Sequence, residues 1–295
     1  MGGTLERMVF QPPTQPTYDA ENADLVWLRT RRRERIPAFF IDRNADLTVL
    51  FSHGNAEDIG MVVEYFRDVS ALWRCNFFVY EYVGYGRSTG KPSEKGVYEA
   101  AEAAYSYLTE DMKIPPRSLI AYGRSLGTGA CCHLGTRVPL GGMILQSALA
   151  SVHRVGLHIR FSLPGDMFCN IDKIHKVAVP VFIIHGTHDE VVPVHHGMQL
   201  YNKCKNKVTP YWVAGGGHNN LELLGRREFY SNVARFLQFI RLEKARQEEE
   251  AKAAAATAAA ARAATLQSER GGGGAAATAT TAAAAETDNE GVCAP

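Results

Sequence analysis

The sequence predicts an α/β fold in which a mostly parallel central sheet is covered by helices on both faces. Three observations support this prediction. Short, almost wholly apolar runs recur along the chain, as expected for strands buried on both sides. Segments with helical apolar spacing alternate with these runs. Clusters of glycine and polar residues directly follow several runs, at the sheet edge where such folds place their sites.

Length and composition indicate one large domain and a tail. The chain has 295 residues, and the part before Glu248 is rich enough in large apolar residues to form a deep core. From Glu248 onward it consists mainly of alanine, threonine and glycine. We predict an extended arm over 1–18, a folded domain over 19–243 and a low-complexity tail over 244–295, partly helical and then disordered.

Charge and cysteine content narrow the class of protein. The formal net charge of +1 provides no strong field for nucleic acid, so we expect no nucleic-acid partner. The six cysteines match no zinc-ligand spacing, and we expect neither a metal nor another cofactor. We find no signal-peptide pattern and no run of about 18 apolar residues. These features predict a cytoplasmic protein with free thiols.

The first two strands are predicted over Leu25–Leu28 and Ile36–Ile41, as a hairpin. The arginine-rich segment Arg29–Arg35 connects them. A solvated hairpin tip is the simpler interpretation of this segment. The alternative is peripheral membrane contact, in which each basic residue near anionic head groups contributes about 1 kcal/mol.

The remaining elements follow from the same patterns. Strands are predicted over Asp46–Ser52, Cys75–Tyr82, the run that starts at Leu119, Gly142–Gln146, Val179–His185 and Thr209–Val213. Helices are predicted over Ile59–Trp73, Glu94–Glu110, the segment after Ser125, His195–Lys203 and Phe229–Ile240.

A short cap is predicted over about 151–177. Its apolar residues either pack onto the sheet or line an acyl groove, in which each buried methylene contributes about 0.8 kcal/mol. These residues are Val155, Leu157, Ile159, Phe161, Leu163, Met167 and Phe168.

The strongest local signal is Gly123-Arg124-Ser125-Leu126-Gly127, a G-x-S-x-G between a strand and a helix. A strand that turns sharply into a helix around serine needs small neighbours, because Cβ atoms there would collide. The strained turn presents the serine oxygen as a nucleophile. A helix-capping serine is the alternative interpretation.

A serine hydroxyl attacks only when a base takes its proton and an acid orients that base. Asp189 lies on the loop after a predicted strand, and His218 follows three glycines after the last strand. The chain order Ser, Asp, His is the order found around a nucleophile elbow. We therefore predict Ser125, Asp189 and His218 as catalytic residues, with Glu190 as a weaker alternative to Asp189.

Acyl transfer also needs N–H donors for the developing oxyanion, each of which is worth about 2.7–4 kcal/mol. The backbone N–H of Leu126 is one predicted donor. The turn after the third strand supplies the other, from the backbone of Asn55 or Ala56. His53 is expected to brace this turn. The alternative is an ordinary connection between a strand and a helix.

Together these residues resemble the α/β-hydrolase superfamily from about Val9 to Ile240. They most specifically resemble its α/β-hydrolase domain-containing 17 subfamily, and more loosely the Bem46-like serine hydrolases. The matching segments are Phe10-Gln11-Pro12-Pro13 with Thr17-Tyr18, Leu50–Ala56, Gly84-Tyr85-Gly86, Gly90-Lys91-Pro92, Asn170–Ile174, Ile184–Thr187 with Asp189-Glu190-Val191, and Gly217-His218-Asn219. In this resemblance the family's triad falls on Ser125, Asp189 and His218.

The resemblance implies an α/β-hydrolase fold and a protein depalmitoylase, a thioesterase that removes palmitoyl groups from S-acylated proteins. It also implies an N-terminal cysteine cluster that is palmitoylated, whereas the first cysteine here is Cys75. The residue chemistry alone predicts acyl hydrolysis in general. A lipid or small-ester carboxylesterase therefore stays open, as does a catalytically idle hydrolase fold used as a binding module.

Overall fold

The computed structural model of the chain describes residues 9–157 and 164–271, with side chains as far as Arg262. By compactness the chain divides into two units, Met1–Lys244 and Ala245–Pro295. The sheet and all candidate site residues lie in the first unit.

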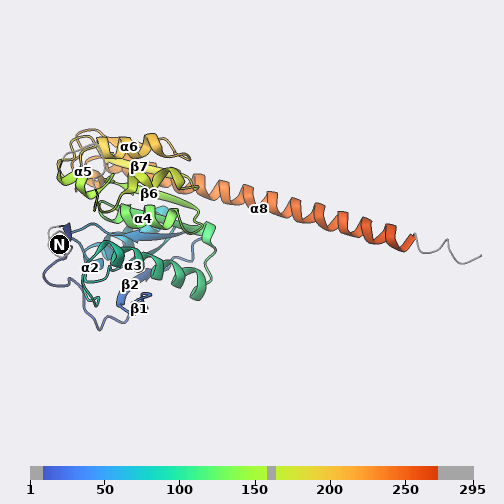
Figure 1. The fold of residues 1–295 in the computed structure, drawn as a ribbon, viewed down its shortest axis with the longest axis horizontal. Coiled ribbons are helices and arrows are strands. Elements are labelled where there is room, and N and C mark those ends of the chain that lie inside the picture. Colours follow the sequence, from blue (N-terminus) through green and yellow to red (C-terminus); the bar gives the residue numbers. More distant parts are fainter. Residues whose placement is uncertain (1–8, 158–163, 272–295) are drawn as a thin grey trace, which may run out of the picture. The chain divides into compact units, whose positions relative to one another are not determined.

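An eight-stranded sheet with the order β1-β2-β4-β3-β5-β6-β7-β8 forms the centre of the first unit (Figure 1). Strand β2 runs antiparallel to β1 and β4, and every other neighbouring pair is parallel. This confirms the predicted, mostly parallel sheet. The strands are β1 (Leu25–Arg29), β2 (Arg35–Ile41), β3 (Thr48–Ser52), β4 (Asn76–Tyr80), β5 (Leu119–Arg124), β6 (Gly142–Gln146), β7 (Val181–Gly186) and β8 (Tyr211–Val213).

Helices cover both faces of the sheet, as predicted (Figure 1). Helices α3, α4 and α6 contribute to the apolar cluster on one face, and α2 with the first turns of α8 to the cluster on the other. The helices are α2 (Ile59–Trp73), α3 (Glu94–Ser106), α4 (Gly127–Gly135), α5 (Val152–Gly156), α6 (His195–Lys203), α7 (Leu221–Leu224) and α8 (Arg226–Gly271). Short 3-10 turns lie at Pro116–Ser118, Asn170–Asp172 and Ile174–Lys176, and one π-helical turn at Tyr107–Asp111.

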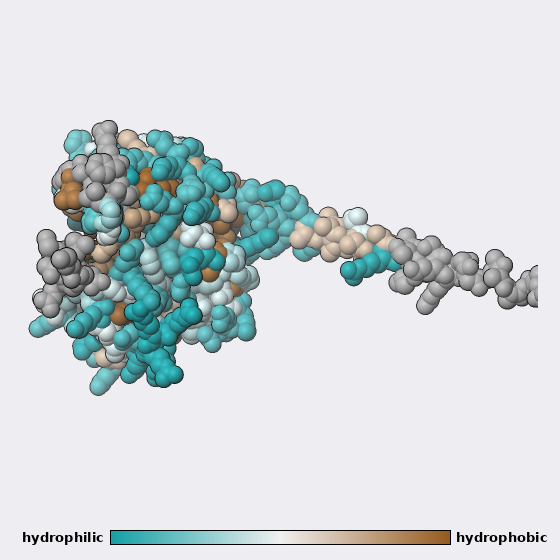
Figure 2. Space-filling view, viewed as in Figure 1, coloured by the Kyte–Doolittle hydropathy of each residue, from teal (hydrophilic) through white to brown (hydrophobic). Residues whose placement is uncertain are grey.

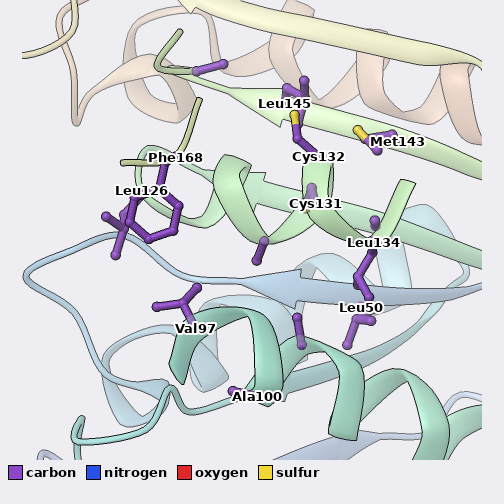
Figure 3. Packing of buried hydrophobic residues seen from close by; sticks show 14 of the residues in the cluster. Leu50, Val97, Ala100, Leu126, Cys131, Cys132, Leu134, Met143, Leu145 and Phe168 are labelled. Atoms are coloured by element: carbon purple, nitrogen blue, oxygen red, sulfur yellow. The ribbon is translucent and has the colours of Figure 1, made fainter. Parts of the chain in front are cut away.

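Side chains alternate between the two faces along each central strand, which divides the core into two layers. In β3, Leu50 belongs to one layer, and its neighbours Val49 and Phe51 belong to the other. Figure 3 shows the first layer, where Leu50 lies beside Leu134 of α4 and Val97 of α3 belongs to the same cluster. Because all five β3 residues are buried, the strand has a fixed register and its carboxyl end a fixed place.

Helix α2 starts directly after the turn that follows β3, because Asp58 caps it. The Asp58 carboxylate accepts a hydrogen bond from the backbone N–H of Met61 at 3.1 Å. It also accepts one from the N–H of Thr17 at 2.7 Å, and another from the Thr17 hydroxyl. The cap therefore fixes both the helix start and the end of the N-terminal arm.

The last helix continues into the segment predicted as a partly helical tail. Helix α8 continues beyond Ile240 to Gly271, although none of residues 241–262 is buried. Alanine, glutamate, lysine and arginine dominate this stretch, and their helix propensity extends the helix without an apolar stripe. The part of the tail that was predicted to be disordered lies outside the described residues, beyond Gly271.

The cap contains α5 and the 3-10 turns, and part of it packs rather than lines a groove. Phe168 is fully buried, with its ring 6.0 Å from that of Phe10 and 5.6 Å from that of Tyr98. Figure 3 shows it beside the start of α4. Leu157 is 58% exposed. The other predicted groove residues Ile159, Phe161 and Leu163 lie outside the described part of the chain.

The arginine-rich hairpin tip is partly paired within the fold. Arg32 lies 3.1 Å from Glu99 of α3, and the Arg35 guanidinium stacks over Trp27 at 4.6 Å. Membrane contact through Arg29–Arg35 stays a prediction. Hydrophilic residues dominate the face shown in Figure 2, and no helix among the described residues is long and apolar enough to cross a membrane.

Candidate active site

The sharp turn between β5 and α4 has the backbone that a nucleophile elbow requires. Ser125 adopts a left-handed conformation with a φ of 51°. A Cβ on Gly127 would lie 2.0 Å from the Ser52 carbonyl oxygen, and one on Gly123 would lie 2.5 Å from the Gly127 oxygen. No residue larger than glycine fits at either position, so the flanking glycines are required by the turn itself.

Three predicted side chains from separate strand ends meet at this turn. The Nε2 atom of His218 lies 3.0 Å from the Ser125 Oγ. The Nδ1 atom of His218 lies 2.8 Å from one carboxylate oxygen of Asp189 and 3.0 Å from the other. The carboxylate that contacts His218 is that of Asp189, the residue preferred in the prediction. Glu190, the weaker alternative, is exposed.

Asp189 is held from several sides. Its Oδ1 accepts hydrogen bonds from the N–H of Val191 at 3.0 Å and of Val192 at 2.7 Å. The fully buried His185 places its Nε2 3.3 Å from Oδ2 and donates to the Val192 carbonyl at 2.7 Å. Burial raises the pKa of Asp189, but hydrogen bonds from His185 and His218 outweigh it and hold the pKa well below its usual value.

The ionised Asp189 determines which nitrogen of His218 carries the proton. A carboxylate only accepts hydrogen bonds, so Nδ1 must donate to it. In the neutral imidazole this leaves the lone pair of Nε2 facing the Ser125 hydroxyl. The arrangement can therefore take a proton from Ser125, which is the first requirement for nucleophilic attack.

The predicted oxyanion donors lie beside the elbow. Ser52 of β3 is in register with Gly123 of β5, so the turn after β3 adjoins the turn after β5. Within the described part of the chain, the backbone N–H groups of Leu126, Asn55 and Ala56 donate to no other residue. These amides are available to a negatively charged oxygen bound at Ser125.

The Asn55 side chain has a role that the sequence analysis missed. Its Nδ2 donates to the Val9 carbonyl at 2.7 Å, and its Oδ1 accepts from the Gln11 N–H at 3.1 Å. The Tyr85 hydroxyl donates to the same Oδ1 at 2.7 Å. One amide thus fastens the N-terminal arm to the turn that carries a predicted oxyanion donor.

His53 lies beneath this turn as a buried, paired group. Its Nδ1 is 2.9 Å from the Gly54 oxygen, and its Nε2 is 3.4 Å from Glu81, which is also fully buried. Burial lowers the pKa of His53, but the hydrogen bond and charge of Glu81 outweigh burial, so the pKa is raised. The ring stacks on Tyr82, with centroids 4.0 Å apart. His53 contacts neither Ser125 nor His218 in any described hydrogen bond, and its contacts are those of a brace.

Three charged residues that had no predicted role also surround the elbow. Arg124 precedes Ser125, Glu57 follows the turn after β3, and Glu222 comes four residues after His218. Arg124 lies within the G-x-S-x-G, Glu57 directly follows the segment Leu50–Ala56, and Glu222 lies shortly after Gly217-His218-Asn219. A charged residue in or near each of these three segments was the sequence signal that could have indicated this cluster.

The sheet order and the elbow together define an α/β-hydrolase fold, and solved structures share it. The esterase Pf2001 from Pyrococcus furiosus superimposes with a TM-score of 0.64 at 17% identity, over 78% of this chain and 97% of that one. An esterase from Rhodococcus superimposes with a TM-score of 0.57 at 15% identity, over 73% of this chain and 98% of that one.

Sequence relatives define the family more narrowly. Alpha/beta hydrolase domain-containing protein 17B from Xenopus tropicalis is 42% identical over 215 residues, which cover 71% of this chain and 75% of that protein. Protein 17C from Mus musculus is 38% identical over 225 residues, or 75% and 69% of the two chains. Residues 40–133 also match the family described as Chlamydia CHLPS protein (DUF818). The chain belongs to the α/β-hydrolase domain-containing 17 family.

The depressed pKa of Asp189 predicts a pH dependence of stability. In the unfolded state the Asp189 carboxyl has a pKa of about 3.9, so near this pH the unfolded chain binds more protons than the folded one. The free energy of unfolding therefore falls as the pH drops through and below about 3.9. We expect Asp189→Asn, which cannot titrate, to flatten the fall in unfolding free energy between about pH 5 and pH 2. Urea unfolding across this range measures it. Glu190→Gln is the exposed control, and equal slopes for the wild type and Asp189→Asn would contradict the prediction.

The Asn55 contacts predict how the arm is retained. Asn55→Asp keeps the acceptor for Gln11 but loses the donor to Val9, and places a carboxylate against a carbonyl. The loss of this part-buried hydrogen bond costs about 1 kcal/mol or more, so we expect hydrogen exchange at the Gln11 amide to rise about tenfold. Asn232→Asp is the matched control, because the Asn232 Nδ2 also donates to a carbonyl at 2.7 Å, on α8. Unchanged exchange in Asn55→Asp would show that the arm is held by other contacts.

Proposed function

We propose that this α/β hydrolase is a serine hydrolase that cleaves acyl thioesters or esters through Ser125, and that its natural substrates are S-acylated proteins. The observation that carries the proposal is the position of His218. Its two ring nitrogens lie within 3.0 Å of the Ser125 hydroxyl and of the Asp189 carboxylate. An imidazole so placed can move a proton between serine and substrate while it stays oriented by a fixed anion.

In the first half of the reaction, the Ser125 Oγ attacks the acyl carbonyl carbon while the Nε2 of His218 takes the hydroxyl proton. Asp189 stabilises the imidazolium that forms. The carbonyl oxygen becomes negatively charged and accepts hydrogen bonds from the N–H of Leu126 and of Asn55 or Ala56. The tetrahedral intermediate then expels the leaving thiol or alcohol, which receives its proton from His218.

In the second half, water replaces the leaving group. His218 takes a proton from the water while the water oxygen attacks the carbonyl carbon of the acyl group on Ser125. The same backbone amides stabilise the second tetrahedral intermediate. Its collapse breaks the bond to the Ser125 Oγ, returns the proton from His218 to that oxygen and releases the carboxylic acid. The cycle uses only residues of this chain and one water.

The proposal that the acyl group is palmitoyl rests on family membership and not on the triad. The triad chemistry applies equally to thioesters and oxygen esters, so a lipid or small-ester carboxylesterase is the second candidate. The solved structures that share the fold favour it, because they are esterases. The short cap, of which the structure describes α5 and two 3-10 turns, favours the first candidate, because we expect a short cap to leave room for the peptide that carries the acyl group.

A fluorophosphonate probe tests the nucleophile. We expect the wild-type protein to be labelled on Ser125 and Ser125→Ala to remain unlabelled, because the probe reacts only with an activated serine. Ser231→Ala is the control, since Ser231 is exposed on α8 and its hydroxyl contacts no histidine among the described residues. It should label like the wild type. Absence of labelling in the wild type would favour the idle binding module.

A substrate series separates the two enzymatic candidates. We expect kcat/KM for S-acylated cysteine peptides to rise with acyl chain length up to palmitoyl, because each buried methylene adds about 0.8 kcal/mol. Glycerol esters of matched acyl chains provide the comparison, and Ser125→Ala gives the background rate. A preference for short-chain glycerol esters would contradict the depalmitoylase assignment and support the carboxylesterase.

A further inference from the structure

Arg124, the residue directly before Ser125, places its guanidinium group between two carboxylates from other loops. It forms an ion pair with Glu57, and its Nη1 lies 3.8 Å from the Oε1 of Glu222. The three side chains are 20%, 18% and 14% exposed, in the order Arg124, Glu57, Glu222. The planar guanidinium can pair with two carboxylates at once, which a lysine ammonium on a flexible stem does less well.

The Glu57 branch leads to the turn that carries the second oxyanion donor. The Oε2 of Glu57 accepts a hydrogen bond from the Gly54 N–H at 2.7 Å, while its Oε1 pairs with Arg124. Burial raises the pKa of Glu57, but the charge and hydrogen bond of Arg124 outweigh burial and the pKa is lowered. An ionised Glu57 therefore links Arg124 to the backbone just before Asn55 and Ala56.

The Glu222 branch leads to the loop that carries His218. Glu222 lies in α7, and its Oε1 accepts a hydrogen bond from the Gln146 Nε2 at 2.7 Å. The backbone oxygen of Gln146 accepts one from the Ser125 N–H at 2.9 Å. This branch connects α7, the end of β6 and the elbow.

We propose that Arg124 is a positioning residue that holds the oxyanion turn through Glu57, and the His218 loop through Glu222, at fixed distances from Ser125. The inference depends on the proposed function and identifies what aligns that site. Without Arg124, two part-buried carboxylates would lack a cation and repel each other, so one or both loops would shift. The shift would mainly raise the energy of the transition state, in which the oxyanion donors and His218 must both be in place.

The test measures how fast a fluorophosphonate probe inactivates the protein, with kinact and KI determined separately. We expect Arg124→Met to lower kinact by about 10- to 100-fold, because a displaced oxyanion donor approaches the loss of one. KI should change little, because the proposed role of Arg124 is to align the groups that react and not to bind the probe. Adding Glu57→Gln to Arg124→Met should restore much of kinact, since glutamine still accepts from Gly54 without an unpaired charge.

Arg241→Met is the matched control. The Arg241 side chain is 21% exposed and pairs with Asp46 at 3.0 Å, before the amino end of β3. Loss of this ion pair should lower the thermal midpoint and leave kinact unchanged. If Arg124→Met does not fold, Arg124→Lys decides the question, because it keeps the charge and should still lower kinact.

Two results would overturn the inference while leaving the proposed function intact. One is wild-type kinact in folded Arg124→Met or in Arg124→Lys. The other is an equal loss of kinact in Arg241→Met with no recovery in the double variant, which would indicate general loss of stability. Failure of the wild type to react at all would instead overturn the proposed function, and the inference with it.

Discussion

The backbone of Gly127 packs directly against the carbonyl of Ser52, and the rest of the site depends on this contact. A Cβ at Gly127 would come within 2.0 Å of that oxygen, so only glycine allows the start of α4 to lie against the end of β3. The contact makes the turn around Ser125 and the turn after β3 neighbours. A hydrogen bond of 2.9 Å from the Ser125 N–H to the Gln146 oxygen fixes the elbow on its other side. Catalytic geometry here begins with the close approach of two backbones.

Buried charges then hold the loops around that contact. The Asp189 carboxylate has His218 and two backbone amides as partners, Glu57 has Arg124, and Glu81 has His53. The three side-chain pairs Asp189–His218, Glu57–Arg124 and Glu81–His53 each join segments at the ends of two different strands. Buried pairs of this kind contribute little net stability, because desolvation opposes the attraction, but removing one partner is costly. Their main effect here is to make one loop arrangement much more favourable than others.

The fold and the three meeting side chains could be predicted because their signals are local. An apolar run marks a strand, and Ser125, Asp189 and His218 each follow one closely. The partners of Arg124 could not be predicted in this way, since Glu57 lies 67 positions away and the pairing exists only after the sheet forms. The Asn55 contact with Val9, across 46 positions, has the same origin. The partly helical tail could be predicted from helix propensity, but the exact end of α8 could not, because beyond Ile240 the helix has no apolar stripe.

The left-handed backbone of Ser125 has a consequence for how this protein can change. An L-residue in that conformation costs about 1–2 kcal/mol, and only glycine avoids the cost. Glycine carries no side-chain oxygen, so the substitution that relaxes the turn also removes the proposed nucleophile. Selection for stability and selection for reactivity therefore oppose each other at this one position. A lineage that no longer needed hydrolysis would be free to lose the serine and become more stable by doing so.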